Sequence, residues 1–311
     1  VWDFSADLDR HTDSSPLHKA VFPQPVFTED DRKSQQAHLT KTQWAQPAIG
    51  VTSMALLNVL EDLGLRADAC AGHSYGELTA LYYAKTFKAQ HFIQASQKRG
   101  ALMNEAAKLP GAMTAVKASA KKLQPLLDTW KASHEIDVVI ANHNSPKQSV
   151  LSGTVEDIEK IEGLLSEAGF FGQRLGVATA FHSKVVAGSV QPFEQYLSGL
   201  PLKAPECTVY ANRTAKPYGQ GIPDLVSTLS KQISSPVRFV ELIESMHNDG
   251  VSIFVEVGPR NILGKLVKSI LRKKDVQIVS LDRPGKSDLF GLLDGLAQLA
   301  SLGITMDWSA L

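Results

Sequence analysis

The expected fold is decided by the stretch Ala69-Cys70-Ala71-Gly72-His73-Ser74-Tyr75-Gly76-Glu77-Leu78. A short apolar run leads into it and a helical pattern over residues 77–85 follows it, so Ser74 stands at a strand-to-helix turn. In a Gly-x-Ser-x-Gly elbow, two glycines let the backbone pass so tightly that the serine hydroxyl becomes exposed. Unpaired N–H groups at the start of the helix would stabilise an oxyanion at the same place. Ser74 is therefore the candidate nucleophile, and an ordinary Gly-flanked turn is the alternative.

The bulk composition is that of a globular protein. The chain has 311 residues, of which 43% are hydrophobic and 21% are charged. Its 32 basic and 32 acidic residues cancel, which argues against nucleic acid or a membrane as partner, and no apolar run is long enough to span a bilayer. Two cysteines, Cys70 and Cys207, cannot build a disulfide framework, so we expect a reducing, cytoplasmic location. The start at Val1 has no methionine, which suggests a piece excised from a longer protein.

The chain alternates between helical and strand patterns around the elbow. Residues 1–40 are polar and rich in proline, and we expect loops and short helical turns there. Helical spacing is seen at residues 51–63 and 89–105, and a short strand is expected at 67–71. In the C-terminal part, short strands are expected at 208–212, 253–257 and 276–281, with helices at 225–233, 238–248, 261–274 and 289–299. Such alternation predicts a mainly parallel sheet flanked by helices.

The middle of the chain has a different order. Residues 112–178 read as strand, helix, strand, strand, helix, strand, which is the ferredoxin-like βαββαβ arrangement. The predicted architecture is therefore an α/β protein with two parts. Residues 1–111 and 179–311 would form a larger, α/β-hydrolase-like domain, and residues 112–178 would be a smaller ferredoxin-like subdomain inserted into it. A cleft between the two parts would be a natural ligand site.

Seven short motifs together carry a family resemblance. The motifs, in order, are Gln46-Pro47-Ala48, Gly72-His73-Ser74-Tyr75-Gly76-Glu77, Arg99-Gly100-Ala101-Leu102-Met103, Gly111-Ala112-Met113, Asn144-Ser145-Pro146, Ala180-Phe181-His182-Ser183 and Glu256-Val257-Gly258-Pro259. With these motifs the chain resembles, over its whole length, the malonyl-CoA:acyl carrier protein transacylases. It is similar in particular to the acyltransferase domains of iterative synthases that make polyunsaturated fatty acids and enediyne polyketides.

The resemblance implies a reaction through a covalent intermediate. Ser74 would attack the thioester of malonyl-CoA and pass the acyl group to the phosphopantetheine thiol of an acyl carrier protein. His182 would take the Ser74 proton and return it to the leaving thiolate. No metal and no permanently bound cofactor is expected. The expected partners are the carrier protein and neighbouring synthase domains such as a ketosynthase.

The same resemblance assigns substrate contacts. An arginine fork can bind a carboxylate through two parallel hydrogen bonds, so Arg99 would select malonyl over neutral acyl groups. Phe181 would fill the space that an α-methyl substituent needs. Gln46 and Asn144 would line the site, although either could instead satisfy loop backbone. His73 should point away from the reacting atoms and act as support.

Two further roles follow from the family pattern. The backbone carbonyl of Asp249, in the loop 248–250, would orient His182, and the backbone N–H of Tyr75 would be one donor of the oxyanion hole. The chain also departs from the pattern twice. It lacks the Gly-Gln-Gly segment that supplies the other oxyanion donor in family members, and it carries Tyr75 where smaller aliphatic residues are usual.

Two rival functions remain open from the sequence. An α/β serine hydrolase or thioesterase would need a triad such as Ser74, Asp224 and His247, but His247 ends an amphipathic helix rather than a loop after the last strand. A non-catalytic docking domain could keep the fold alone. A basic helix face could attract an acidic carrier protein or simply be solvated; its residues are Lys265, Lys268, Arg272, Lys273 and Lys274.

Overall fold

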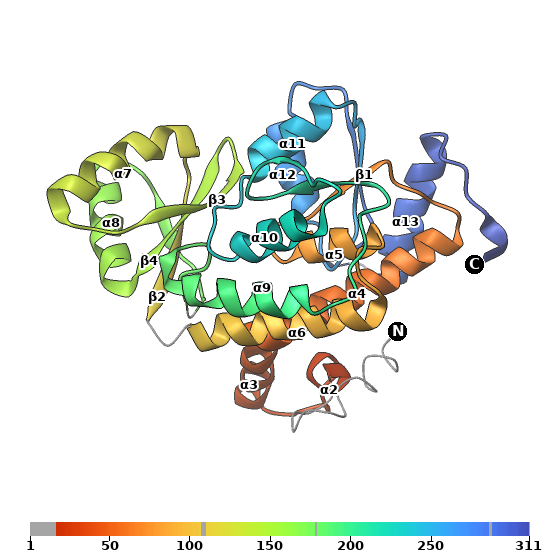
Figure 1. Ribbon diagram of the computed structural model, residues 1–311, viewed down its shortest axis with the longest axis horizontal. Helices are drawn as coiled ribbons and strands as arrows, with labels where there is room; N and C mark the ends of the chain where they lie inside the picture. The colour runs from red at the N-terminus through yellow and green to blue at the C-terminus, as the bar shows by residue number, and fades with distance from the viewer. Residues whose placement is uncertain (1–16, 107–109, 178, 286–287, 311) are drawn as a thin grey trace.

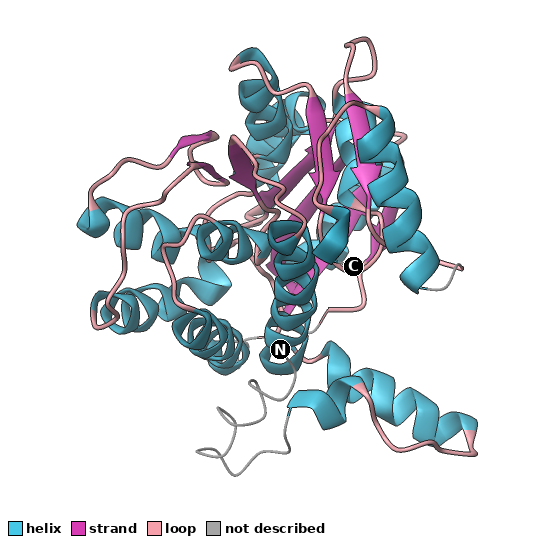
Figure 2. Ribbon diagram, turned by 90° about the vertical axis from the view of Figure 1, so that its right-hand side faces the viewer, coloured by secondary structure: helices cyan, strands magenta, loops and turns pink. Residues whose placement is uncertain are grey.

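The computed structural model describes residues 17–106, 110–177, 179–285 and 288–310. Strand β1 (Ala69–Ala71) pairs in parallel with β6 (Thr208–Ala211), and the short β7 (Lys216–Pro217) continues this sheet antiparallel to β6. Strands β8 (Ile253–Glu256) and β9 (Gln277–Ser280) form a second parallel pair. Helices surround these strands, as Figures 1 and 2 show. The predicted α/β class is confirmed and these strands pair mainly in parallel, but they form a three-stranded and a separate two-stranded sheet instead of the single sheet expected.

The helices around these strands agree with most of the periodicity. They are α5 (Gly76–Tyr83) and α6 (Ala89–Ala106) after the elbow, and α10 (Ile222–Gln232), α11 (Phe239–Asn248) and α13 (Asp288–Ser301) in the C-terminal half. Helix α12 (Leu263–Ile270) is shorter than expected at both ends. A 3-10 turn, η2 (Lys184–Ser189), and helix α9 (Val190–Ser198) had no counterpart among the predicted elements. A last 3-10 turn, η3 (Trp308–Ala310), ends the described chain.

Residues 111–174 form a separate antiparallel sheet, seen at the left of Figure 1. Its strands are β2 (Gly111–Val116), β3 (Val139–Ser145), β4 (Gln148–Thr154) and β5 (Gly172–Arg174), in the spatial order β3-β4-β2-β5. Helices α7 (Ala120–His134) and α8 (Val155–Glu167) pack together on one face of it. This is the element order expected for residues 112–178. The exact domain boundaries stay predictions, and the boundary residue 178 lies outside the described residues.

The other face of the small sheet turns toward the rest of the chain. Along β2, Ala112 and Val116 join the helices α7 and α8, whereas Met113 packs with Phe181 in a second cluster. This is the alternation that a strand buried on both faces shows. The His143 N–H donates to the Val237 carbonyl and the Val237 N–H donates to the Ala141 carbonyl, and these two bonds tie β3 to the segment after α10. The small sheet is therefore anchored beside the segment that carries His182.

Residues 17–40 differ from the prediction of loops and short turns, and the rest of that prediction, residues 1–16, lies outside the described residues. Helix α2 (Leu17–Val21) is short, but α3 (Glu29–Thr40) runs for 12 residues. Thr28 caps it by accepting a hydrogen bond from the backbone N–H of Asp31, and none of its residues is buried. Without an apolar stripe there was no periodic signal to find. Helix α4 (Thr42–Asp62) also begins earlier than expected and continues through Pro47.

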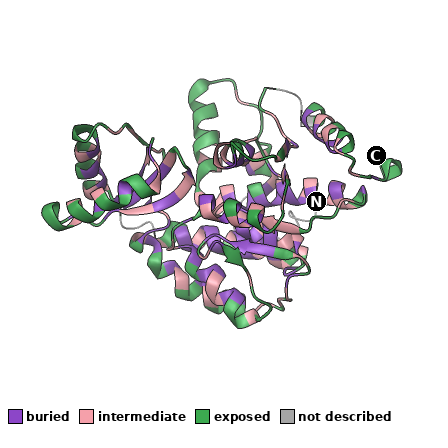
Figure 3. Ribbon diagram, turned by 90° about the horizontal axis from the view of Figure 1, so that it is seen from above, coloured by how far each residue is buried: buried purple, intermediate pink, exposed green. Residues whose placement is uncertain are grey.

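The main core lies beneath the elbow. Leu78 and Leu81 of α5 pack with Val51 of α4 and with Phe92 and Ile93 of α6, and all five side chains are buried. Figure 3 shows this buried interior surrounded by exposed outer helix faces. Within the described residues, none of the helices combines the length and the apolar character needed to cross a bilayer.

Candidate active site

The elbow has the geometry that its sequence predicts. Strand β1 ends at Ala71, and Ser74 follows in the left-handed region with φ 51°. A Cβ on Gly72 would lie 1.9 Å from the backbone carbon of Gly76, so no larger residue fits at this crossing. A non-glycine residue in this conformation costs on the order of 1–3 kcal/mol, and such strain persists only where the surroundings impose it. The turn therefore presents Ser74 at the start of α5.

Ser74 and His182 form a hydrogen-bonded pair. The Ser74 Oγ lies 2.8 Å from Nε2 of His182. On the other side of the ring, Nδ1 lies 3.1 Å from the carbonyl oxygen of Gln232 and 3.0 Å from that of Ser235. Because carbonyls only accept, Nδ1 carries the proton and Nε2 accepts from the Ser74 hydroxyl. This is the arrangement of a nucleophile beside its base.

The predicted role of Asp249 is wrong. The carbonyls that orient His182 belong to Gln232 and Ser235, at the end of α10. Asp249 follows α11, and its carboxylate accepts a hydrogen bond of 2.5 Å from the Tyr210 hydroxyl. The physical reason is that the last carbonyls of a helix have no partner within the helix. The end of α10 lies beside His182 and supplies such carbonyls.

The rival triad does not assemble. His247 lies on α11, where its Nδ1 contacts the carbonyl oxygen of Val251 at 3.2 Å, and the serine hydroxyl already has His182 as its partner. Asp224 lies exposed in the first turn of α10. The geometry thus pairs the serine with His182 and leaves the alternative acid and base elsewhere.

His182 is neutral at physiological pH. Its side chain is 3% exposed, and burial, followed by the positive charge of Arg99, lowers its pKa to about 3. The two carbonyl contacts on Nδ1 oppose this shift without cancelling it. A neutral imidazole has a free lone pair on Nε2, so the ring can accept the serine proton.

Arg99 is a buried cation close to this pair. The side chain is 1% exposed, and its Nη2 donates a hydrogen bond of 2.9 Å to Oε1 of Gln232. Burial lowers the pKa of Arg99 to about 10, so it remains charged near neutral pH. An arginine fork has five N–H donors, and among the described residues the side-chain partner found for it is this one neutral acceptor, so the fork can offer donors to an anionic ligand. Gly100 keeps this part of α6 tight against α4, since a Cβ there would lie 2.7 Å from the Thr42 carbonyl oxygen.

Gln232 connects all three of these residues, and the sequence reasoning missed it. Its Nε2 donates to the backbone carbonyl of Ser74 at 2.6 Å, its Oε1 accepts from Arg99, and its own carbonyl accepts from His182. The side chain is fully buried. The sequence offered one signal for Gln232: it is a polar residue at the end of an amphipathic helix, three residues before Ser235-Pro236.

Asn212, also missed by the sequence analysis, stabilises the elbow through hydrogen bonds to its backbone. It directly follows β6, the strand paired with β1. Its Oδ1 accepts from the Ser74 N–H at 2.7 Å, and its Nδ2 donates to the Gly72 carbonyl at 2.6 Å. Its own N–H donates to Oε2 of Glu77 at 3.0 Å, while the Tyr218 hydroxyl donates to Oε1. The strained turn is thus held by a buried polar network.

Glu77 is the acidic member of this network. It is fully buried, and burial raises its pKa to about 7, although the hydrogen bonds from Tyr218 and Asn212 favour the charged form. A carboxyl with this pKa changes protonation near physiological pH, which the sequence pattern did not indicate.

The other predicted wall residues lie near the elbow with different partners. Gln46 is buried and its Nε2 contacts Sδ of Met103 at 3.4 Å, while its Oε1 has no hydrogen-bond partner in the described part of the chain. Asn144 accepts at Oδ1 a hydrogen bond of 2.8 Å from Nε2 of His73. Burial lowers the pKa of His73, so its ring is neutral. Phe181 is half-buried against the small sheet.

The Tyr75 hydroxyl lies in the space left by the missing side chain of Gly50. This hydroxyl lies 2.7 Å from Oγ of Ser96, and a Cβ added at Gly50 would come within 2.0 Å of that hydroxyl oxygen. Burial raises the pKa of Tyr75, so the phenol stays protonated. The Tyr75 N–H stands at the N-cap of α5, and no acceptor for it is found among the described residues. It is therefore open to an incoming oxygen.

No group of three or more His, Cys, Asp or Glu side chains in the described ranges is placed to hold a metal ion. The groups that the fold brings together at the elbow are a hydroxyl, a neutral imidazole and a guanidinium. This set can carry out nucleophilic attack on a carbonyl next to a negatively charged substituent.

Comparison with known proteins identifies the family. A family model described as the acyl transferase domain matches residues 17–305. The malonyl CoA-acyl carrier protein transacylase of Bacillus subtilis is 35% identical over 248 residues, which cover 78% of this chain and 77% of that protein. One component of the polyunsaturated fatty acid synthase of a Thraustochytrium species is 29% identical over 305 residues, or 94% of this chain and 10% of that protein.

A solved structure gives the same result. The acyltransferase domain from the second module of the salinomycin polyketide synthase superposes with a TM-score of 0.85 at 29% identity, covering 100% of this chain and 69% of that one. The chain spans only a small part of the Thraustochytrium synthase component and about three quarters of the Bacillus subtilis relative. The resemblance drawn from the seven motifs is confirmed, and the chain belongs to the acyl transferase domain family.

Proposed function

We propose that this chain moves a malonyl group from malonyl-CoA to the phosphopantetheine thiol of an acyl carrier protein, through an ester on Ser74. The observation that carries the proposal is the Ser74–His182 pair at 2.8 Å with the buried Arg99 held beside it by Gln232. The relative from Bacillus subtilis, which this chain matches over most of its length, is named for the same transfer.

The first half-reaction forms the acyl-enzyme. Nε2 of His182 takes the proton as the Ser74 Oγ attacks the thioester carbonyl carbon. Negative charge then develops on the carbonyl oxygen, where the Tyr75 N–H and the start of α5 would stabilise it. As the C–S bond breaks, the imidazolium returns its proton to the CoA thiolate, which leaves as the thiol.

The second half-reaction repeats these steps with a different thiol. The carrier's phosphopantetheine thiol gives its proton to His182 and attacks the ester carbonyl, and the Ser74 oxygen leaves with that proton. Throughout, the proton on Nδ1 stays between the carbonyls of Gln232 and Ser235. The ring is therefore oriented without a carboxylate, and no metal or bound cofactor takes part in this scheme.

Arg99 would select the donor. Two parallel N–H donors of its fork match the malonyl carboxylate, and in a site this dry the charged pair is strong. Phe181, next to His182 and packed on the small sheet, would limit substitution at the α-carbon. Gln46 and Asn144 would line the thioester. The exposed basic residues at and after α12 would meet an acidic carrier protein, and neighbouring synthase domains such as a ketosynthase would consume the loaded carrier.

Intact-protein mass spectrometry tests the proposal. The wild type mixed with malonyl-CoA should gain one malonyl group, and the adduct should disappear when a carrier protein bearing phosphopantetheine is added. Ser74→Ala should show no adduct, and His182→Ala should load far more slowly while keeping its fold. Loss of the adduct to water at the same rate with and without carrier would instead indicate a hydrolase. No adduct in the wild type would indicate a docking domain.

A further inference from the structure

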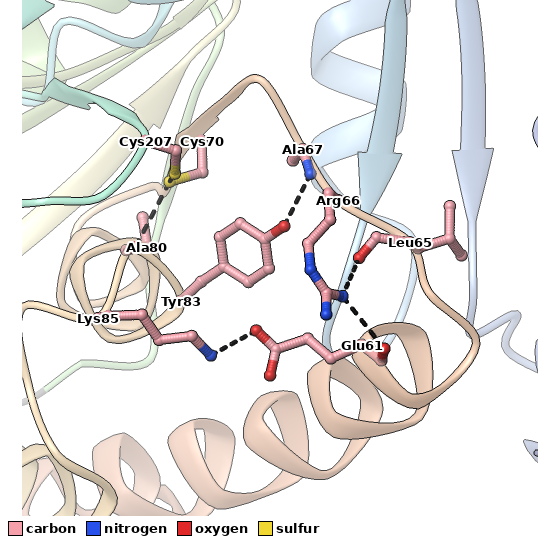
Figure 4. A network of polar contacts seen from close by, with 9 residues as sticks. All are labelled: Glu61, Leu65, Arg66, Ala67, Cys70, Ala80, Tyr83, Lys85 and Cys207. Carbon is pink, nitrogen blue, oxygen red and sulfur yellow. Dashed lines mark hydrogen bonds and ion pairs between the residues drawn. The ribbon is translucent and has the colours of Figure 1, made fainter.

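The two cysteines of the chain lie beside each other, although 137 positions separate them in sequence. The Sγ atoms of Cys70 and Cys207 are 3.7 Å apart. Figure 4 shows the two side chains next to each other. Cys70 belongs to β1, and Cys207 directly precedes β6, the strand with which β1 pairs. Neither thiol has a role in the acyl-transfer scheme.

The surroundings of the two sulfurs differ. Cys70 is half-buried, and its Sγ lies 3.4 Å from the carbonyl oxygen of Ala80. Cys207 is also half-buried, but it lines a surface hollow of about 460 Å³ together with Asp68, Glu206 and Tyr218. A small solute can therefore reach Cys207 from solvent, whereas Cys70 is not among the residues that line this hollow.

The hydrogen bonds, burial and charges around the pair shift the pKa values of the two thiols in opposite directions. A hydrogen bond from Cys70 and the positive charge of Lys85 lower the pKa of Cys207, against the opposing effects of burial and Glu206. The contact with Cys207 and burial raise the pKa of Cys70. The thiolate is the nucleophilic form of cysteine, so the accessible sulfur is also the more reactive one.

We propose that Cys70 and Cys207 form a redox-active dithiol, a modification site that small hydroperoxides convert to an intramolecular disulfide. The Cys207 thiolate attacks one peroxide oxygen, the O–O bond breaks, and hydroxide leaves and takes up a proton as water. The Cys207 sulfenic acid is then attacked by the sulfur of Cys70, which gives up its proton, and a second water leaves as the S–S bond forms. Two thiols are oxidised and one hydrogen peroxide is reduced to two waters.

The position of the pair gives the bond a structural consequence. Strands β1 and β6 lead into the elbow and Asn212 at their carboxyl ends; Cys70 is the middle residue of β1, and Cys207 is the residue before β6. A disulfide would link β1 covalently to the residue before β6 and close a loop whose ends are 137 positions apart in sequence. Crosslinks that close long loops restrict the unfolded chain most, so the oxidised protein should melt at a higher temperature.

Oxidation of the folded protein tests this inference. After treatment with hydrogen peroxide, the wild type should lose two hydrogens in intact mass and both alkylatable thiols, and dithiothreitol should restore them. Ser74→Ala, the matched control, should behave identically because its thiols are unchanged. In Cys70→Ser, dimedone should trap a sulfenic acid on Cys207, whereas Cys207→Ser should react much more slowly.

A comparison with the unfolded chain shows whether disulfide formation depends on the folded arrangement of the two cysteines or would occur between any two thiols. In guanidinium chloride the same disulfide should form at least about tenfold more slowly, because closing so long a loop is improbable in a random chain. The inference would be overturned if the folded wild type kept two free thiols. It would equally be overturned if oxygen added to single cysteines without a disulfide, or if folding gave no rate advantage.

Discussion

Replacing Arg99 by alanine should change which acyl donor the protein accepts. Arg99 is 1% exposed, and its hydrogen bond to Gln232 goes to a neutral acceptor. A malonyl carboxylate would gain two charge-assisted hydrogen bonds from it, each worth about 1.5–3 kcal/mol. Truncating one partner of such a buried pair costs on the order of 3–5 kcal/mol. At about 1.36 kcal/mol for each factor of ten, malonyl loading should fall roughly 150- to 5,000-fold.

The assay must separate this loss from damage to the site. The rates of acyl-enzyme formation from malonyl-CoA and from acetyl-CoA can be followed by mass spectrometry in the wild type, Arg99→Ala and Arg99→Lys. Acetyl has no carboxylate, so its rate measures any disturbance passed through Gln232 to Ser74. The lysine variant keeps the charge without the fork, and it should fall between the other two. A thermal melt of each variant checks the fold.

The ratio of the malonyl and acetyl loading rates decides whether Arg99 binds the donor carboxylate. If Arg99→Ala loses malonyl and acetyl loading by the same factor, Arg99 supports the elbow and does not read the carboxylate. If malonyl loading is unchanged, the anion must bind elsewhere. Only a fall of the malonyl rate relative to the acetyl rate agrees with the proposed contact.

Three other perturbations should give equally definite results. Asn212→Ala removes the acceptor for the nucleophile's own N–H, so acylation should slow about 10- to 100-fold when adduct formation is timed by mass spectrometry. Asn212→Asp keeps that acceptor but sets a carboxylate oxygen against the Gly72 carbonyl, so it should not restore the rate. Gly50→Ala places a Cβ 2.0 Å from the Tyr75 hydroxyl oxygen and should lower the melting temperature by several degrees, and adding Tyr75→Phe should restore part of it; equal melting of the single and double variants would contradict the clash. The pKa of Glu77 is raised to about 7 from an ordinary value of 4.5, so its protonated form favours folding: that stability is complete below pH 4.5 and is lost as pH rises through 7. The wild type should therefore lose melting temperature between about pH 5 and pH 8 relative to Glu77→Gln, and parallel curves would refute the shift.

The sequence was most informative where a candidate catalytic residue and the backbone conformation around it are set by a few neighbouring residues. The elbow needs Gly72 and Gly76 for steric reasons that can be read from a few residues, and the βαββαβ order follows from alternating periodicities. The pairing of Ser74 with His182 was predicted from motifs in which neighbouring residues restrict the possibilities. In these places local rules determine the outcome.

The sequence was least informative where the site depends on which helix end lies nearby, or on a single residue that belongs to no recognisable motif. Asp249 was chosen because its loop precedes a recognisable strand, but free carbonyls occur at the end of every helix and only packing decides which pair meets His182. Gln232 and Asn212 each act through several hydrogen bonds at once. Such bonds depend on the placement of strands and helices far apart in the chain, which periodicity does not supply.

The proximity of Arg99 and His182 links donor recognition to the reactivity of the base. The charge of Arg99 is the second cause, after burial, that lowers the pKa of His182 to about 3, which makes the free imidazole a weak base at neutral pH. A carboxylate bound to Arg99 would offset that charge. The pKa of His182 would then rise toward the operating pH at the moment when a dicarboxylic donor is in place, and a neutral acyl group would leave it low. The same guanidinium would thus discriminate twice, once through binding and once through the strength of the base that activates Ser74.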